Sequence, residues 1–357
     1  MNRSRKFVLI GTAAVLGLVI AGGGLLWYFF NQPLYRPGLV RAEQDLRAPL
    51  APPAQSGAPD FWNVEPDIRL HHFSSGHGRK VLVIHGGPGY PFTQPLTGLE
   101  PLADRYEFVY YDQRGSGRSS RPIDRFSSQN YYQNMLQLDR TLGLGAQVAD
   151  IERIRRLLGE EKLLLIGHSF GGFLAALYAA EFPDHVEALI LISPADVLVM
   201  PQPDGGLFEI VGQRLPDDMR SDYDAYLKRY LDFGGIFSKS ESELAQLNEE
   251  FGKYYAAVAP LPLSEQGRTG GWMVQAMYFS MGQRHDYRKA LAEVNAPVLV
   301  VHGANDLQSE QASRVYADAF ANSQFVVLED AAHFSFEEQP QAFALVVGEF
   351  LNSLSTP

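Results

Sequence analysis

The sequence predicts an α/β protein in which a mostly parallel sheet is flanked by helices. A strand-to-helix unit occupies Lys162 to Ala180, and further short apolar runs of strand length alternate with segments of helical period before and after it. With 357 residues, 46% of them hydrophobic, the chain can bury a large core. These observations favour one large α/β domain with an insertion over several small domains.

The strand-to-helix unit around Ser169 is the centre of this prediction. Leu163 to Ile166 form a continuous apolar run, and the apolar period then changes to helical spacing at Phe170, Phe173, Leu174 and Leu177. Gly167, Ser169 and Gly171 form the pattern Gly-x-Ser-x-Gly, whose small residues permit a strained turn that holds a serine hydroxyl above a sheet. Ser169 is therefore the candidate nucleophile.

The N-terminus predicts a membrane anchor. Residues 1–6 carry Arg3, Arg5 and Lys6, and residues 7–30 follow with no charge, enough to cross a hydrocarbon core of about 30 Å. We expect residues 1–6 to form a cytoplasmic flank and the catalytic domain to lie outside the cytoplasm. The alternative is a secreted protein released by signal cleavage near Val19-Ile20-Ala21. The aromatic end of the run, Trp27 to Phe30, favours the anchor.

The rest of the chain divides into a tether, a core in two parts and a cap. Residues 31–60 hold six prolines, which predicts an extended, semi-rigid tether. Core segments are expected at 61–195 and 291–357, beginning with a hairpin of strands 67–73 and 80–85. Strand signals vanish within 196–290, where helical segments such as 223–230 and 241–258 predict a helical cap inserted between two late strands.

Composition excludes several classes of partner and cofactor. A formal net charge of −11 argues against binding of nucleic acid. The chain has no cysteine, so disulfides, thiolate nucleophiles and cysteine-ligated metals are excluded. Nothing in the sequence predicts a metal ion or another cofactor.

Two glycine-containing loops follow predicted strands. His85 to Gly89 come after the strand Val81 to Ile84, and backbone amides there can stabilise an oxyanion. Pro88 has no N–H, which leaves Gly86 or Gly87 as one donor, and the amide of Phe170, directly after the nucleophile, is the expected second donor. The other loop, Asp112 to Ser119, lacks the third glycine of a nucleotide-binding fingerprint, so we expect its charged residues to brace the loop.

An acid and a histidine follow late strands in the order typical of a serine hydrolase triad. Asp306 comes after the strand Val298 to Val301, and His333 comes after the strand Phe325 to Leu328. His333 would take the proton of Ser169 and return it to the leaving group, while Asp306 would fix the tautomer of His333. Asp196, which also follows a predicted strand, is the alternative acid.

Three motifs in this order resemble the α/β-hydrolase superfamily, and specifically its proline iminopeptidase family. They are His85-Gly86-Gly87-Pro88-Gly89, Asp112-Gln113-Arg114-Gly115-Ser116-Gly117-Arg118-Ser119 and Gly167-His168-Ser169-Phe170-Gly171. The resemblance covers about residues 65 to 355. It implies a core of the eight-stranded type with a helical cap and a serine peptidase that removes an N-terminal residue, often proline, from short peptides. It also implies that Gly87 is the amide donor that acts together with the amide of Phe170.

The chain departs from that family at two points. Phe170 stands where a tryptophan usually follows the nucleophile, and Trp272-Met273-Val274-Gln275 has no acid where the family's Trp-x-x-Trp-Glu holds the substrate amine. Hydrolysis of a small ester, lactone or amide is therefore the second hypothesis, and a catalytically inactive tethered binding domain is the third. Five cap acids could receive a cationic amine, although none is singled out as a substrate ligand: Glu209, Glu241, Glu243, Glu249 and Glu250.

Overall fold

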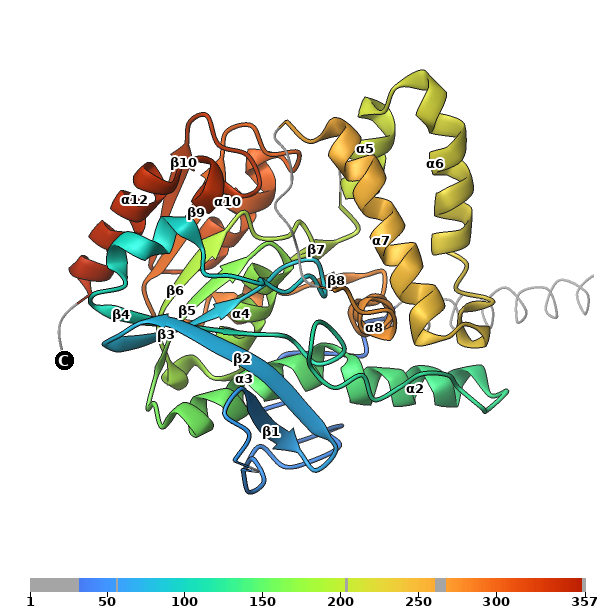
Figure 1. Cartoon of the computed structure of the whole chain (residues 1–357), viewed down its shortest axis with the longest axis horizontal. Coiled ribbons are helices and arrows are strands. Elements are labelled where there is room, and N and C mark those ends of the chain that lie inside the picture. The colour runs from blue at the N-terminus through green and yellow to red at the C-terminus, as the bar shows by residue number, and fades with distance from the viewer. Residues whose placement is uncertain (1–31, 56, 203–204, 261–267, 355–357) are drawn as a thin grey trace, which may run out of the picture.

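An eight-stranded, mostly parallel sheet forms the centre of the molecule (Figure 1). The computed structural model describes residues 32–55, 57–202, 205–260 and 268–354. The strand order is β1-β2-β4-β3-β5-β6-β9-β10; β1 pairs antiparallel with β2, β2 pairs antiparallel with β4, and the other neighbours are parallel. The bounds are β1 (Phe61–Glu65), β2 (Ile68–Gly76), β3 (Arg79–Ile84), β4 (Tyr106–Tyr111), β5 (Leu163–His168), β6 (Val186–Ile192), β9 (Val298–Gly303) and β10 (Ser323–Leu328).

Helices cover both faces of the sheet, so the core has three layers. Successive strand residues point to opposite faces, and accordingly Leu82 and Ile84 pack into one apolar cluster while Val81 and Val83 pack into the other. The first cluster lies under α2 (Tyr131–Leu142), α3 (Leu144–Leu158), α4 (Phe170–Glu181) and α10 (Glu310–Ala319). The second lies under the short helices η1 (Thr97–Leu102) and α11 (Ser335–Glu338) and under α12 (Pro340–Ser353).

Between β6 and β9 the chain leaves the sheet and forms a mainly helical insertion, which we call the cap (Figure 1). Its elements are β7 (Val199–Met200), α5 (Leu207–Arg214), α6 (Asp217–Tyr230), η3 (Ile236–Ser238), α7 (Glu241–Val258), α8 (Trp272–Met281), β8 (His285–Asp286) and α9 (Arg288–Leu291). Buried tyrosines of α6 and α7, among them Tyr223, Tyr226 and Tyr254, give the cap a small core of its own. Helix α7 begins with a capping box. The Ser240 hydroxyl accepts from the N–H of Glu243, and the Glu243 carboxylate accepts from the N–H of Ser240.

The expected hairpin at the start of the core is wrong. Strands β2 and β3 do not pair, because β4 lies between them, antiparallel to β2 and parallel to β3. The central position of β4 buries Phe108 and Tyr110 on one face of the sheet and Val109 and Tyr111 on the other. A strand with this pattern is favoured in the interior of a sheet rather than at its edge.

Residues 32–55 also differ from the extended tether that we expected. Tyr35, Val40 and Leu50 are buried in the main core. The Tyr35 hydroxyl donates to the Glu181 carboxylate at 3.0 Å, and the N–H groups of Val40 and Arg41 donate to the same carboxylate. This segment is therefore an integral part of the domain surface and packs against α4.

The predicted anchor, residues 7–30, lies outside the described residues. Within the described ranges, each helix is too short or too polar to cross a bilayer.

Candidate active site

Ser169 occupies a sharp turn between β5 and α4. Its backbone has φ 54° and ψ −121°, a strained conformation for a residue other than glycine. A side chain at Gly167 would collide with the backbone of Gly171, and one at Gly171 would collide with the backbone of Ile84. The flanking glycines are thus required for the close approach of β5, α4 and β3 that holds Ser169 in this turn.

His333 and Asp306 come together from the loops after β10 and β9. His333 Nδ1 donates to Asp306 Oδ2 at 2.8 Å, and Asp306 Oδ1 accepts the N–H of Gln308 at 3.0 Å. Burial disfavours both charges, but the attraction between the two groups outweighs it. As a result the pKa of Asp306 is lowered and the pKa of His333 is raised. The pair therefore has the charge distribution that stabilises an imidazolium.

His168 links the Ser169 turn to the His333 loop. His168 Nε2 donates to the His333 carbonyl at 2.8 Å, and the two ring centroids lie 4.8 Å apart. Burial, with a smaller contribution from His333, lowers the pKa of His168 to about 3, so His168 stays neutral. Among the described residues no hydrogen bond joins Ser169 Oγ to His333 Nε2. Bonds between a nucleophile and its base are often long until substrate binds.

The loop from His85 to Gly89 lies against Ser169. A Cβ atom on Gly86 would be 2.7 Å from Ser169 Cβ, and Gly87 has a φ of +116°. Burial lowers the pKa of His85 to about 4. The neutral ring donates through Nδ1 to the Gly86 carbonyl at 3.0 Å and accepts the N–H of Gln113 at 3.1 Å. His85 therefore connects this loop to the loop that begins at Asp112, while buried Phe170 occupies the first position of α4.

Charged residues of the Asp112 to Ser119 loop brace it, as the sequence predicts. Asp112 Oδ2 accepts the N–H of Arg118 at 2.7 Å and lies 3.2 Å from His71 Nδ1. Arg114 is fully buried, and its guanidinium bonds Asp150 and Glu65 at 2.5 to 2.7 Å. No sequence motif includes Glu65 or Asp150, which lie on β1 and α3.

The cap contacts this region through α7 and α8. The Tyr255 ring lies edge-on to His333 with centroids 6.5 Å apart, and a Cβ on Gly89 would be 2.9 Å from Met273 Sδ. Gln275 is completely buried, and neither atom of its side-chain amide has a hydrogen-bond partner within the part of the chain that the structure describes. Gln275 thus places a neutral, unsatisfied amide within the cap.

Four of the five candidate cap acids have structural partners. Glu241 accepts from the N–H groups of Gly271 and Trp272 and pairs with Arg121. Glu250 pairs with Arg229, while Glu209 and Glu243 cap α5 and α7. Glu249 is exposed and raises the pKa of Tyr90, although burial is the larger cause of that shift.

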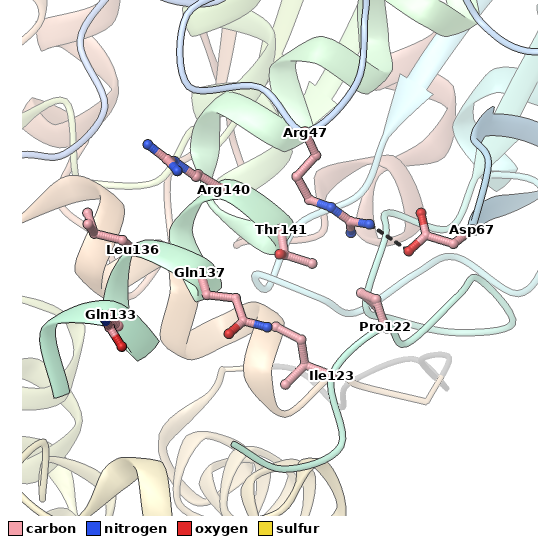
Figure 2. Close-up of a pocket in the computed structure, with 9 residues that line it drawn as sticks. All are labelled: Arg47, Asp67, Pro122, Ile123, Gln133, Leu136, Gln137, Arg140 and Thr141. Carbon is pink, nitrogen blue, oxygen red and sulfur yellow. Dashed lines mark hydrogen bonds and ion pairs between the residues drawn. The ribbon is translucent and has the colours of Figure 1, made fainter. Parts of the chain in front are cut away.

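A cavity of about 540 Å³ lies elsewhere, between residue 47, the loop at 122–123 and α2 (Figure 2). Figure 2 shows Arg47 and Asp67 joined by an ion pair of 2.6 Å at its side. Neither Ser169 nor His333 lines this cavity, so it is separate from the candidate active site. It is lined by Arg47, Asp67, Pro122, Ile123, Gln133, Leu136, Gln137, Arg140 and Thr141.

Sequence reasoning missed several residues around His333. Gln308 accepts the N–H of Asp196 at 2.9 Å and places its Nε2 3.4 Å from His333 Nδ1, and Glu338 accepts the N–H of Ala332. His168 had a usable signal, since it lies inside the Gly-x-Ser-x-Gly motif. Gln308, Tyr255 and Glu338 had none, because only folding brings them to the histidine.

Comparison with known proteins identifies the fold family of the chain. A model of the alpha/beta hydrolase fold family matches residues 80–340. The proline iminopeptidase of Heyndrickxia coagulans is 29% identical over 292 residues, which cover 78% of this chain and 93% of that protein. The proline iminopeptidase of Clostridium botulinum is 25% identical over 296 residues, covering 78% of this chain and 91% of the relative.

A solved structure has the same fold. A thermophilic esterase from Thermogutta terrifontis superimposes with a TM-score of 0.54 at 22% identity, covering 85% of this chain and 97% of the esterase. The chain therefore belongs to the alpha/beta hydrolase family and, within it, resembles the proline iminopeptidases.

Proposed function

We propose that this protein is a serine hydrolase that works through an acyl-enzyme. The observation that carries the proposal is the buried His333–Asp306 hydrogen bond, which the His168 link holds beside the strained turn of Ser169. A histidine oriented by a carboxylate next to a serine on a tight turn is the arrangement that activates a hydroxyl nucleophile.

Each group has one role in the proposed reaction. Ser169 Oγ attacks the substrate carbonyl while His333 takes its proton, and Asp306 stabilises the resulting imidazolium. The amides of Gly87 and Phe170 stabilise the negative oxygen of the tetrahedral intermediate. His333 then gives the proton to the leaving group, and water attacks the acyl-enzyme in the same way to release the acid.

The first candidate substrate is a short peptide that loses its N-terminal residue. The three sequence motifs and the relatives named proline iminopeptidase support this reading. Of the five candidate cap acids, exposed Glu249 is the one without a structural partner among the described residues, so it is available to receive an amine.

The second candidate is a small ester, lactone or amide without a charged amine. The observation that favours it is buried Gln275, a neutral amide in the stretch where the family places a glutamate. A neutral amide can bond a carbonyl or hydroxyl but gives no charge to balance an ammonium group.

Turnover of two substrate classes separates these candidates. The full chain is incubated with prolyl and alanyl naphthylamides and, in parallel, with p-nitrophenyl esters of short acids. Cleavage of the naphthylamides supports the peptidase, and cleavage of esters alone overturns it. Ser169→Ala should abolish turnover and labelling by a fluorophosphonate, whereas labelling that survives this change would contradict Ser169 as nucleophile.

For location, we propose that residues 7–30 anchor the protein with the catalytic domain outside the cytoplasm. The uncharged 24-residue run after a basic flank supports this topology. Protease added to cells whose outer barrier has been opened should remove the domain. Protection of the domain would refute the orientation, and recovery of a soluble chain that lacks the run would favour signal cleavage.

A further inference from the structure

Three of the four exposed large apolar side chains in the described ranges lie at or near the start of α2. In the described ranges, the large apolar side chains that are more than a third exposed are Tyr131 (39%), Tyr132 (55%), Leu231 (44%) and Leu345 (62%). The first three are neighbours, because the Tyr131 hydroxyl donates to the carbonyl of Phe233, two residues after Leu231, at 3.0 Å. We call Tyr131, Tyr132 and Leu231 the apolar patch. Leu345 lies on α12, which Figure 1 shows across the molecule from α2.

The apolar patch is close to the point where the described chain begins. The Tyr131 ring packs edge-on against Phe279 of α8, with centroids 6.2 Å apart. Gly282 follows α8, and a Cβ atom on it would be 2.7 Å from the carbonyl oxygen of Gln32. Gly282 and Phe279 are three helical residues apart, a rise of about 4.5 Å, so with the Phe279 side chain between them Gln32 lies within about 20 Å of the Tyr131 ring.

Almost no chain separates Gln32 from the apolar run. The run ends at Phe30, and only Asn31 stands before Gln32, whose carbonyl already contacts the domain. Two extended residues span at most about 7 Å. If residues 7–30 cross a bilayer, the face of the domain around Gln32 must therefore lie at the lipid headgroups. No flexible linker would separate this face from the bilayer.

We propose that the apolar patch lies in the headgroup region of the membrane that anchors residues 7–30, so that the domain is held in one orientation on the bilayer. Tyrosine is enriched at membrane interfaces because its ring is apolar and its hydroxyl is polar. Two of the three patch residues are tyrosines, and the interfacial layer is about 5 to 7 Å deep on each side, enough to take side chains of this size. This inference rests on the proposed anchor and not on the catalytic mechanism.

The chain has no cysteine, so a thiol-reactive label attaches only to a cysteine that is introduced at a chosen position. Single variants Tyr132→Cys, Leu231→Cys and Leu345→Cys of the full chain are labelled with nitrobenzoxadiazole and reconstituted in phosphatidylcholine–phosphatidylglycerol vesicles. Some vesicles contain lipids with a nitroxide near the headgroup. We expect the labels at 132 and 231 to be blue-shifted and quenched several-fold more strongly than the label at 345. Thermal unfolding of each variant verifies that it is folded.

Two further comparisons show whether lipid or a second copy of the chain covers the apolar patch. Quenching that persists when the protein-to-lipid ratio is lowered supports lipid, whereas quenching lost on dilution indicates a second copy and overturns the proposal. Equal, weak quenching at 132, 231 and 345 also overturns it. So does a chain that stays in the aqueous fraction, a result that leaves the serine hydrolase proposal intact.

Discussion

Two buried charged clusters in this molecule differ in which polar atom is left without a hydrogen bond, a carboxylate oxygen in one and an imidazole nitrogen in the other. Arg114 makes four hydrogen bonds, to Glu65, to both oxygens of Asp150 and to the Thr141 carbonyl. Asp150 and Glu65 also accept from Arg153 at 3.1 Å. In the His333–Asp306 pair, by contrast, His333 Nε2 has no hydrogen-bond partner among the described residues.

The difference separates a structural cluster from the pair that we propose to be reactive. A buried charge is tolerated when it is paired within the protein, and the Arg114 cluster pairs two arginines with two carboxylates. Glu65 Oε2 has no hydrogen-bond partner among the described residues and lies 3.7 Å from Arg47 Nε as an ion pair. His333 keeps one ring nitrogen available for a proton, while Asp306 stabilises the charged form. The burial of ionic groups alone would not have distinguished the two clusters.

The largest effect is expected at the reactive pair. Asp306→Asn keeps the size of the side chain but favours the wrong tautomer of His333, so kcat should fall by about 10⁴-fold. The measurement is turnover of whichever substrate the wild-type chain cleaves. Asp196→Asn is the matched control and should leave kcat close to wild type. A larger loss in the control would make Asp196 the catalytic acid.

The Arg114 cluster should respond in stability rather than in chemistry. Arg114→Met leaves buried Glu65 and Asp150 short of positive charge, and breaking such a pair costs about 3–5 kcal/mol in the free energy of unfolding. Urea denaturation of the variant and the wild-type chain measures this loss in the free energy of unfolding. Arg125→Met removes an exposed pair with Glu243 and should cost far less than Arg114→Met, because solvent screens the exposed charges. Similar losses in both variants would contradict the distinction.

A milder test addresses the buried carboxylate of Glu181. Tyr35→Phe removes one donor to Glu181 and should cost about 1.5–3 kcal/mol, as for hydrogen bonds to charged groups. Tyr287→Phe removes a hydroxyl that donates at 3.3 Å to a neutral carbonyl and should cost about 0.5–1.5 kcal/mol. If both variants unfold at the same urea concentration, the charge of Glu181 does not strengthen the bond.

The smallest expected effect is a shift of the pH profile. In the proposed mechanism the neutral imidazole of His333 is the base, so kcat/KM should fall as pH falls through the pKa of His333. Burial lowers the pKa of His333, but the attraction of Asp306 raises it by more than burial lowers it. The midpoint should therefore lie above the ordinary histidine value of about 6.5. In Asp306→Asn the raising charge is lost and the midpoint of the residual activity should move to lower pH. An unchanged midpoint would assign the acid limb to another group.

Local sequence patterns predicted most of the elements. The helix expected over residues 241–258 is α7, because its serine cap and N3 glutamate are local signals. The strands expected around 163–166, 188–192, 298–301 and 325–328 are β5, β6, β9 and β10. β5, β6 and β9 are short apolar runs buried inside a sheet that is covered on both faces, which gives them an unbroken apolar sequence. β10 is a half-buried edge strand, and its apolar run Phe325 to Leu328 still predicted it.

Non-local pairing was not predictable in the same way. Nothing within residues 67–85 shows that β4 separates β2 from β3. In residues 32–55 the buried side chains are too widely spaced to form a period, so the prolines dominated the prediction. For the site, the chain order selected Ser169, Asp306 and His333. Only the fold shows that His333 is hydrogen-bonded to Asp306 and that His168 is hydrogen-bonded to the backbone of the loop that contains His333.

The packing of residues 32–55 determines where a soluble fragment of this enzyme can begin. A cut at about residue 60 would remove the hydroxyl and two amides that solvate Glu181, together with the Ala48 and Pro49 carbonyls that Arg153 bonds. Two charged side chains would then lose ligands that water must replace at a newly opened apolar surface. A fragment that starts at Gln32 keeps these groups and is the shorter chain to prefer for crystallisation and assay.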